Sequence, residues 1–171
     1  MGTMNMFASH TFIAVGSAVF VAVVSHTALG TLAQAVTQET PVGTWRVIDD
    51  KSDRAKGIVE ISEVNGELKG KVVRVLDQEN QTGPAICKSC PGELKGEPIE
   101  GMTVLWGFER EGDQWADGKI LDPSNGRIYS ASLQMDEAGE KLDVRGYVGI
   151  SWLGRTQVWE RADEAAELEN K

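Results

Sequence analysis

The sequence predicts an all-β domain, an eight-stranded antiparallel up-and-down barrel, and three observations support this. From residue 43 onward, short β-prone runs alternate with turn residues. No window longer than about ten residues shows the apolar period of 3.6 residues that a helix needs. The later runs alternate apolar and polar residues, so one face of each is expected to be buried. Closing the strands into a barrel removes exposed edges, although a sandwich remains the alternative.

Eight β-prone runs define the predicted strands. They span residues 44–49, 57–64, 67–76, 102–110, 114–121, 127–135, 141–148 and 152–161. Asn65-Gly66 is the strongest hairpin signal, because a type I′ turn needs positive φ at both central residues. Turn residues at 111–113, 124–126 and 137–139 close later hairpins. Strands that are consecutive in sequence should therefore pair antiparallel.

Alternation assigns the inner face of the later strands. In the sixth run, one face carries Tyr129, Ala131, Leu133 and Met135. In the seventh run, one face carries Leu142, Val144, Gly146 and Val148. The interior of an eight-stranded barrel is either filled by such side chains or wide enough for one small ligand. Periodicity leaves both possibilities open.

The N-terminal segment 1–35 reads as a secretory signal peptide. It contains no Asp, Glu, Lys or Arg, and the mostly apolar run 12–24 is followed by Ala33-Gln34-Ala35, an A-x-A cleavage site. At about 1.5 Å per residue, that run spans about 20 Å of a roughly 30 Å hydrocarbon core. We expect a periplasmic or secreted protein, with no stable membrane insertion after cleavage, that begins near Val36.

The composition excludes several classes of function. The 17 Lys and Arg against 26 Asp and Glu make nucleic acid an unfavourable partner, since phosphate neutralisation needs a basic surface. Both histidines, His10 and His26, fall in the leader, so imidazole-based catalysis and His-ligated metal are excluded from the mature chain. We expect no enzyme, cofactor or metal. The mature chain is then one barrel domain, 36–161, and an acidic tail, 162–171.

The only two cysteines, Cys87 and Cys90, lie in the longest irregular stretch, 77–101. In an exported protein, this pair suggests a disulfide that rigidifies the loop. A redox-active C-x-x-C is the alternative, which would need a lowered thiol pKa.

The five tryptophans have two interpretations. They are Trp45, Trp106, Trp115, Trp152 and Trp159. They either fill the barrel core and its ends, or some of them line a ligand cavity in which an arginine supplies a charged hydrogen bond. The candidate ligand-binding residues are Trp106, Tyr129, Arg145, Trp152 and Arg155.

Gly43-Thr44-Trp45, at the start of the first predicted strand, resembles the lipocalin-like group, in which Gly-x-Trp opens strand one. The resemblance implies that Trp45 packs across the closed barrel end beneath an arginine of the last strand. Arg161 is the candidate for that arginine, with Arg155 as the alternative.

A longer series of motifs is more specific. It comprises Cys87-Lys-Ser-Cys-Pro-Gly-Glu-Leu-Lys-Gly, Gly101-Met-Thr-Val-Leu-Trp-Gly, Ile120-Leu-Asp-Pro-Ser-Asn-Gly, Val144-Arg-Gly-Tyr-Val-Gly-Ile and Leu153-Gly-Arg-Thr-Gln-Val-Trp. Over residues 42–161 the chain resembles the exported bacterial proteins of the domain of unknown function 2147 family. The resemblance implies a small exported barrel of calycin type and brings no established activity.

The leading hypothesis is an exported barrel that binds a small apolar or amphipathic ligand. One alternative is a cell-envelope structural or interaction module with a filled barrel, acting through the loop 77–101. The other is a thiol-redox protein acting through Cys87 and Cys90. Ligand binding requires an apolar interior cavity larger than about 300 Å³.

Overall fold

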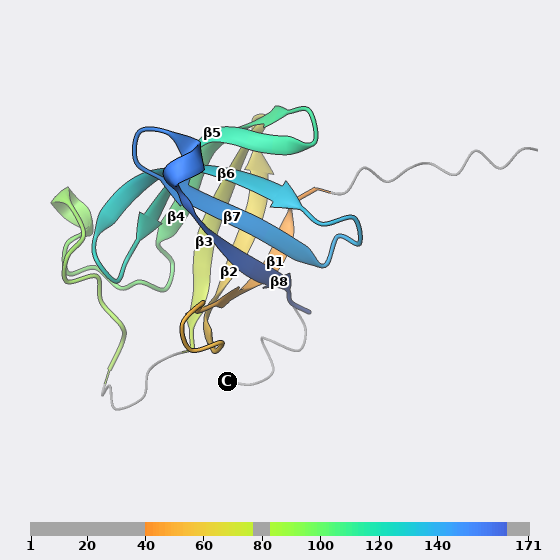
Figure 1. Cartoon of the computed structure of the whole chain (residues 1–171). Coiled ribbons are helices and arrows are strands. Elements are labelled where there is room, and N and C mark those ends of the chain that lie inside the picture. Colours follow the sequence, from red (N-terminus) through yellow and green to blue (C-terminus); the bar gives the residue numbers. More distant parts are fainter. Residues whose placement is uncertain (1–39, 77–82, 164–171) are drawn as a thin grey trace, which may run out of the picture. The chain divides into compact units, whose positions relative to one another are not determined.

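The computed structural model describes residues 40–76 and 83–163, and the strands within them form a closed antiparallel barrel (Figure 1). The strands are β1 (Gly43–Ile48), β2 (Ala55–Val64), β3 (Glu67–Val75), β4 (Thr103–Glu111), β5 (Gln114–Asp122), β6 (Arg127–Met135), β7 (Lys141–Tyr147) and β8 (Arg155–Arg161). Each strand pairs with the next in sequence, and β8 closes on β1. The predicted all-β, eight-stranded up-and-down barrel is confirmed. The predicted leader and most of the predicted acidic tail lie outside the described residues.

The eighth strand begins later than the sequence indicated. Ser151–Leu153 forms a short 3-10 turn, η2, and β8 starts at Arg155. Gly154 lies between them, where an added Cβ would come within 2.7 Å of the Gly146 carbonyl oxygen. This close approach of two backbones turns the chain before the strand can begin.

The two ends of the barrel differ in their connections. The hairpins β2–β3, β4–β5 and β6–β7 lie at one end, which is called the closed end below. β1 begins and β8 ends at this same end. The remaining connections lie at the other end, which is called the open end below. Among the described residues they comprise 49–54, 76 and 83–102, 123–126 and 148–154.

Large side chains fill the closed end. Trp45 and Phe108 are completely buried there, with Leu68, Leu133 and Leu142 beside them in one core cluster. Trp45 Nε1 donates a hydrogen bond of 2.7 Å to the Pro41 carbonyl oxygen, so its one polar atom is satisfied. Because no buried polar group is left unpaired around Trp45, this ring can close the barrel end.

Arg161 covers Trp45. The guanidinium carbon lies 4.3 Å from the ring centroid of Trp45, a cation–π distance. Arg161 Nε donates to the Gly139 carbonyl oxygen at 2.6 Å, and Nη1 donates to that of Val42 at 3.3 Å. The contact therefore holds β8, the β6–β7 turn and the start of β1 together.

The connection between β3 and β4 packs against the open end through a disulfide. Cys87 and Cys90 are bonded to each other, as the sequence predicted, and both are buried. Their side chains belong to the same core cluster as Met102 and Leu121. A bridge between Ile86 and Pro98 ties the two arms of the connection together.

Gly126, in the β5–β6 turn, lies against residues 87–90, which are called the disulfide segment below. It has a φ of +72°, and a Cβ there would collide with the Ser89 carbonyl group. Asp122 organises the same turn, because its carboxylate accepts hydrogen bonds from Ser124 N at 2.9 Å and from Asn125 Nδ2 at 2.7 Å. The disulfide segment thus rests directly on the backbone of a turn at the barrel mouth.

We predict that Gly126→Ala weakens this docking, whereas Gly112→Ala serves as a matched control. Gly112 also has a positive φ, +66°, but an added Cβ would meet nothing within 4 Å. Left-handed strain should cost each variant about 1–2 kcal/mol in free energy of unfolding, and Gly126→Ala should lose about 2–4 kcal/mol in total. Urea unfolding measures this cost.

The same pair of variants separates strain from docking. Dithiothreitol should reduce the Cys87–Cys90 bond faster in Gly126→Ala than in Gly112→Ala, since only the first variant displaces the segment that buries the sulfurs. Equal reduction rates in the two variants would contradict docking on Gly126.

Candidate functional site

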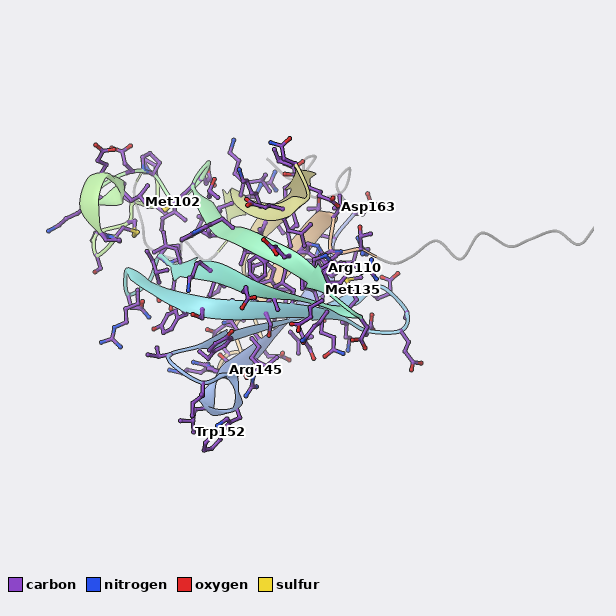
Figure 2. All side chains as sticks on the ribbon, turned by 90° about the horizontal axis from the view of Figure 1, so that it is seen from above. Met102, Arg110, Met135, Arg145, Trp152 and Asp163 are labelled. Atoms are coloured by element: carbon purple, nitrogen blue, oxygen red, sulfur yellow. A yellow bond between two sulfur atoms is a disulfide. The ribbon has the colours of Figure 1, made fainter. Side chains whose placement is uncertain are left out.

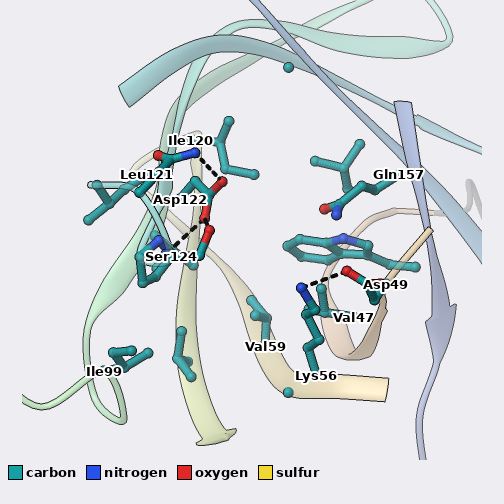
Figure 3. A pocket seen from close by; sticks show the side chains of 18 of the residues that line it. Val47, Asp49, Lys56, Val59, Ile99, Ile120, Leu121, Asp122, Ser124 and Gln157 are labelled. Carbon is teal, nitrogen blue, oxygen red and sulfur yellow. Dashed lines mark hydrogen bonds and ion pairs between the residues drawn. The ribbon is translucent and has the colours of Figure 1, made fainter. Parts of the chain in front are cut away.

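A cavity of about 660 Å³ occupies the open half of the barrel (Figure 3). All eight strands contribute to its lining, together with Ile99 and the turns at 49–51 and 123–125. Its volume lies within the range of about 300–1,000 Å³ that is typical of small-molecule sites. The cavity exceeds the minimum that the ligand-binding hypothesis requires.

Tapering side chains create this space. On β2 the inward residues Ile61, Val59 and Gly57 become smaller toward the open end, and all three are buried. On β7 the inward residues also become smaller toward the open end, from Leu142 through Val144 to Gly146. The larger members pack in the core, while Val59, Gly57, Val144 and Gly146 line the cavity. The barrel is therefore filled at one end and hollow at the other.

Most of the inner wall is apolar. Its apolar members include Val47, Val59, Val72, Val104, Ile120, Val144 and Trp159. Polar side chains gather where the strands reach the open end, in the turns after β1 and β5 and at the start of β8. Such a wall can bury an apolar body while a polar group remains near the mouth.

Asp49 is the centre of the β1–β2 turn. Its Oδ2 lies 2.6 Å from Lys56 Nζ, while its Oδ1 accepts hydrogen bonds from Ser52 N and Ser52 Oγ, both at 2.8 Å. The hydrogen bond from Lys56, followed by those from Ser52, holds the pKa of Asp49 far below its usual range. The ion pair of Lys56 with Asp49 forms part of the pocket wall (Figure 3).

A second ion pair joins β8 to the same turn. Arg155 contacts the Asp50 carboxylate through Nε and Nη2. The hydrogen bond from Arg155 lowers the pKa of Asp50, and in turn raises the pKa of Arg155. Asp49 and Asp50 are therefore ionised at neutral pH and already paired.

The structure separates the predicted ligand-binding residues. Tyr129 and Arg155 line the cavity, and the Tyr129 hydroxyl accepts a hydrogen bond from Asn125 Nδ2 at 3.2 Å. Trp106, Arg145 and Trp152 lie outside the lining. Trp106 is half-buried on β4 opposite Lys119, against the core cluster.

Arg145 and Trp152 belong to the connection between β7 and β8. Arg145 Nε donates to the Ser151 carbonyl oxygen at 2.8 Å, and Nη1 donates to Thr156 Oγ1 at 2.9 Å. Trp152, in η2, is 73% exposed and projects away from the barrel (Figure 2). Arg145 thus fixes the η2 turn, and Trp152 lies on its outer surface.

The sequence patterns assigned no ligand-binding role to Asp49, Asp50, Lys56 or Gln157, although all four line the cavity. The taper of inward residues toward Gly57 and Gly146 was the available signal for a hollow open end. The pairing of Asp50 with Arg155, 105 residues apart, carries no local signal at all.

Residues 40–76 and 83–163 contain neither a metal-binding cluster nor a membrane-spanning helix. No group of three or more His, Cys, Asp or Glu side chains there is placed to hold a metal ion. No helix in this part of the chain has the length and apolar content needed to cross a membrane.

Residues 43–161 match the sequence profile of a family described as "Uncharacterized protein conserved in bacteria" (DUF2147). The chain belongs to the DUF2147 family. Among curated proteins, none shows significant similarity to this DUF2147 chain. The match spans the whole barrel, from the first residue of β1 to the last residue of β8.

Two solved structures resemble the DUF2147 barrel. Protein HP1028 from Helicobacter pylori, described as belonging to the lipocalin family, is 19% identical with a TM-score of 0.63; the alignment covers 75% of this chain and 86% of that chain. A mutant of the fluorescent protein UnaG is 15% identical with a TM-score of 0.40, over 72% of this chain and 96% of that chain. The first likeness shows that the DUF2147 chain has a lipocalin-like fold.

We predict that Asp49→Asn makes the stability of this DUF2147 protein less dependent on pH. The unfolded carboxyl takes up a proton near its usual pKa of about 3.9, whereas the folded one resists protonation to much lower pH. The contribution of Asp49 is therefore present in full at pH 7 and is lost as the pH falls below about 4 toward the lowered folded-state pKa.

Urea unfolding at pH 7 and at pH 2.5 checks this prediction. The variant should be less stable than the wild type at pH 7, and the gap should narrow at pH 2.5. Asp143→Asn, on the exposed face of β7, is the control and should leave the pH dependence unchanged. A gap of the same size at both pH values would count against the paired Asp49.

Proposed function

We propose that this protein binds a small apolar or amphipathic molecule in the open half of its barrel. The observation that carries the proposal is the cavity of about 660 Å³, whose inner wall is formed largely by valine, isoleucine and tryptophan side chains. Transfer of apolar ligand surface into such a site is worth about 25 cal/mol per Å². This supports ligand binding over the alternative of a barrel filled by its own side chains.

The arrangement of charges supports an amphipathic ligand. The pairs Asp49–Lys56 and Asp50–Arg155 lie at the mouth, and the apolar wall lies below them. A ligand with one polar end would keep that end near the mouth and bury the rest. Because these two pairs hold the β1–β2 turn against β2 and β8, this part of the mouth is formed before a ligand arrives and needs little rearrangement.

Gly146→Phe tests ligand binding by filling the cavity. Gly146 lines the cavity on β7, and an added Cβ would meet only Ile120 and Tyr129, both at 3.7 Å. The phenyl ring should therefore enter the cavity without moving the backbone. We expect N-phenyl-1-naphthylamine, a neutral fluorescent probe, to bind the wild type and to lose at least about tenfold in affinity for Gly146→Phe.

Three controls locate the probe. Gly146→Ala should bind the probe like the wild type, because one methyl group leaves most of the cavity open. Val158→Phe, on the outer face of β8, and Trp152→Ser, on the exposed η2 turn, should also leave binding unchanged. Probe binding that survives Gly146→Phe but is lost in Trp152→Ser would place the probe on the outer surface and refute the proposal.

We also propose that the protein is exported and that residues 1–35 are removed. The Cys87–Cys90 disulfide supports this, since disulfides persist mainly in oxidising compartments. The intact mass of the protein from its own host should equal that of a chain starting near Val36, less two hydrogens. The full-length mass, or the mass with free thiols, would contradict export.

A further inference from the structure

One buried polar atom stands out in the described part of the chain. Trp159 Nε1 is the single buried side-chain nitrogen or oxygen there without a hydrogen-bond partner. Trp159 is only 2% exposed and lines the cavity from β8. Trp45, by contrast, donates its indole hydrogen to a backbone carbonyl. An unpaired buried donor destabilises a fold, so Trp159 Nε1 calls for an acceptor from outside the described residues.

The two side chains opposite Trp159 in the neighbouring strands provide no acceptor. In the strand register it lies opposite Val47 on β1 and Leu142 on β7, and both side chains are hydrocarbon. Gln157, two residues earlier on the same face, lines the cavity opposite Val144. Its carboxamide makes no hydrogen bond to the described residues, and Figure 3 shows it reaching into the pocket. One wall of the cavity therefore holds two unpaired polar groups among apolar side chains.

The charged groups of the lining favour an uncharged acceptor at this depth. Lys56 and Arg155 are already paired with Asp49 and Asp50. The other two cations of the lining, Lys51 and Arg74, lie in the β1–β2 turn and at the open-end terminus of β3. Trp159 lies deeper than these pairs, because β8 runs from Arg155 at the open end to Arg161 at the closed end. A carboxylate brought beside Trp159 would lose its hydration and gain only neutral N–H donors, which do not compensate for a buried charge.

We propose that the ligand carries an uncharged carbonyl oxygen, as in a ketone, ester or amide with apolar substituents, that accepts a hydrogen bond from Trp159 Nε1. This inference rests on the proposed function. The carboxamide of Gln157 offers a second donor on the same wall, and a carbonyl oxygen has two lone pairs to use both. A pure hydrocarbon fits the wall but leaves the indole N–H unpaired.

The test uses two probes of nearly the same shape, 1-acetonaphthone and 1-ethylnaphthalene, which differ by the carbonyl oxygen. Each displaces N-phenyl-1-naphthylamine from the wild type and from Trp159→Phe, which keeps an aromatic ring but lacks the N–H. The measured quantity is the affinity ratio of ketone to hydrocarbon, so differences in the hydration of the two probes cancel between the proteins. We expect Trp159→Phe to lower this ratio by about three- to tenfold.

Trp115→Phe is the matched control. Trp115 is also buried, at 6% exposed, but it does not line the cavity, so its replacement should leave the affinity ratio unchanged. A ratio that Trp159→Phe leaves unchanged, or that both variants lower equally, would overturn the inference. If N-phenyl-1-naphthylamine does not bind the wild type, or binds Gly146→Phe equally well, the proposed function has failed instead.

A second measurement uses the wild type alone and does not depend on the folding of a variant. The Trp159 indole N–H resonance, assigned by triple-resonance NMR, should move downfield with 1-acetonaphthone and much less with 1-ethylnaphthalene. Equal shifts with the two probes would show that the ring senses proximity only, and would overturn the hydrogen bond.

Discussion

The stacking of Arg161 on Trp45 is the contact on which the rest of the barrel depends. β1 and β8 share three residue pairs, as do β3 and β4, whereas β6 and β7 share six, so the closing seam is one of the two shortest ladders of the barrel. Arg161 strengthens this seam because its guanidinium covers the Trp45 ring and donates to the carbonyl oxygens of Gly139 and Val42. With the closed end sealed in this way, the open half can remain hollow without exposing the core to water.

The sequence was sufficient to predict the fold, because the order and alternation of the strands follow from local patterns. The disulfide was also predictable, since Cys87 and Cys90 are only three residues apart. The cavity lining was harder to assign. Gly107, with a φ of +73°, interrupts the alternation of β4, so Leu105 and Phe108 are both buried while Trp106 between them is only half-buried.

The other misplaced candidates have different causes. Arg145 stands between Val144 and Gly146, which line the cavity, so alternation alone already directs it to the outer face. Trp152 looked like a strand residue because of its apolar neighbours, yet it lies in the η2 turn. The ion pair of Asp50 with Arg155 joins residues that come together only once the barrel has closed, and no local pattern encodes it.

The mouth of the cavity is held in place by contacts that are independent of one another. Lys56 and Ser52 fix Asp49, Arg155 ties Asp50 to β8, and the disulfide segment rests on Gly126. A cavity mouth held in this way would lose little conformational entropy if a ligand bound. Among the described residues, the same chain leaves one buried side-chain donor unpaired, Trp159 Nε1, and the residue that carries it lines the cavity. An unpaired group in so well satisfied a surrounding is best explained by a partner that the chain itself does not contain.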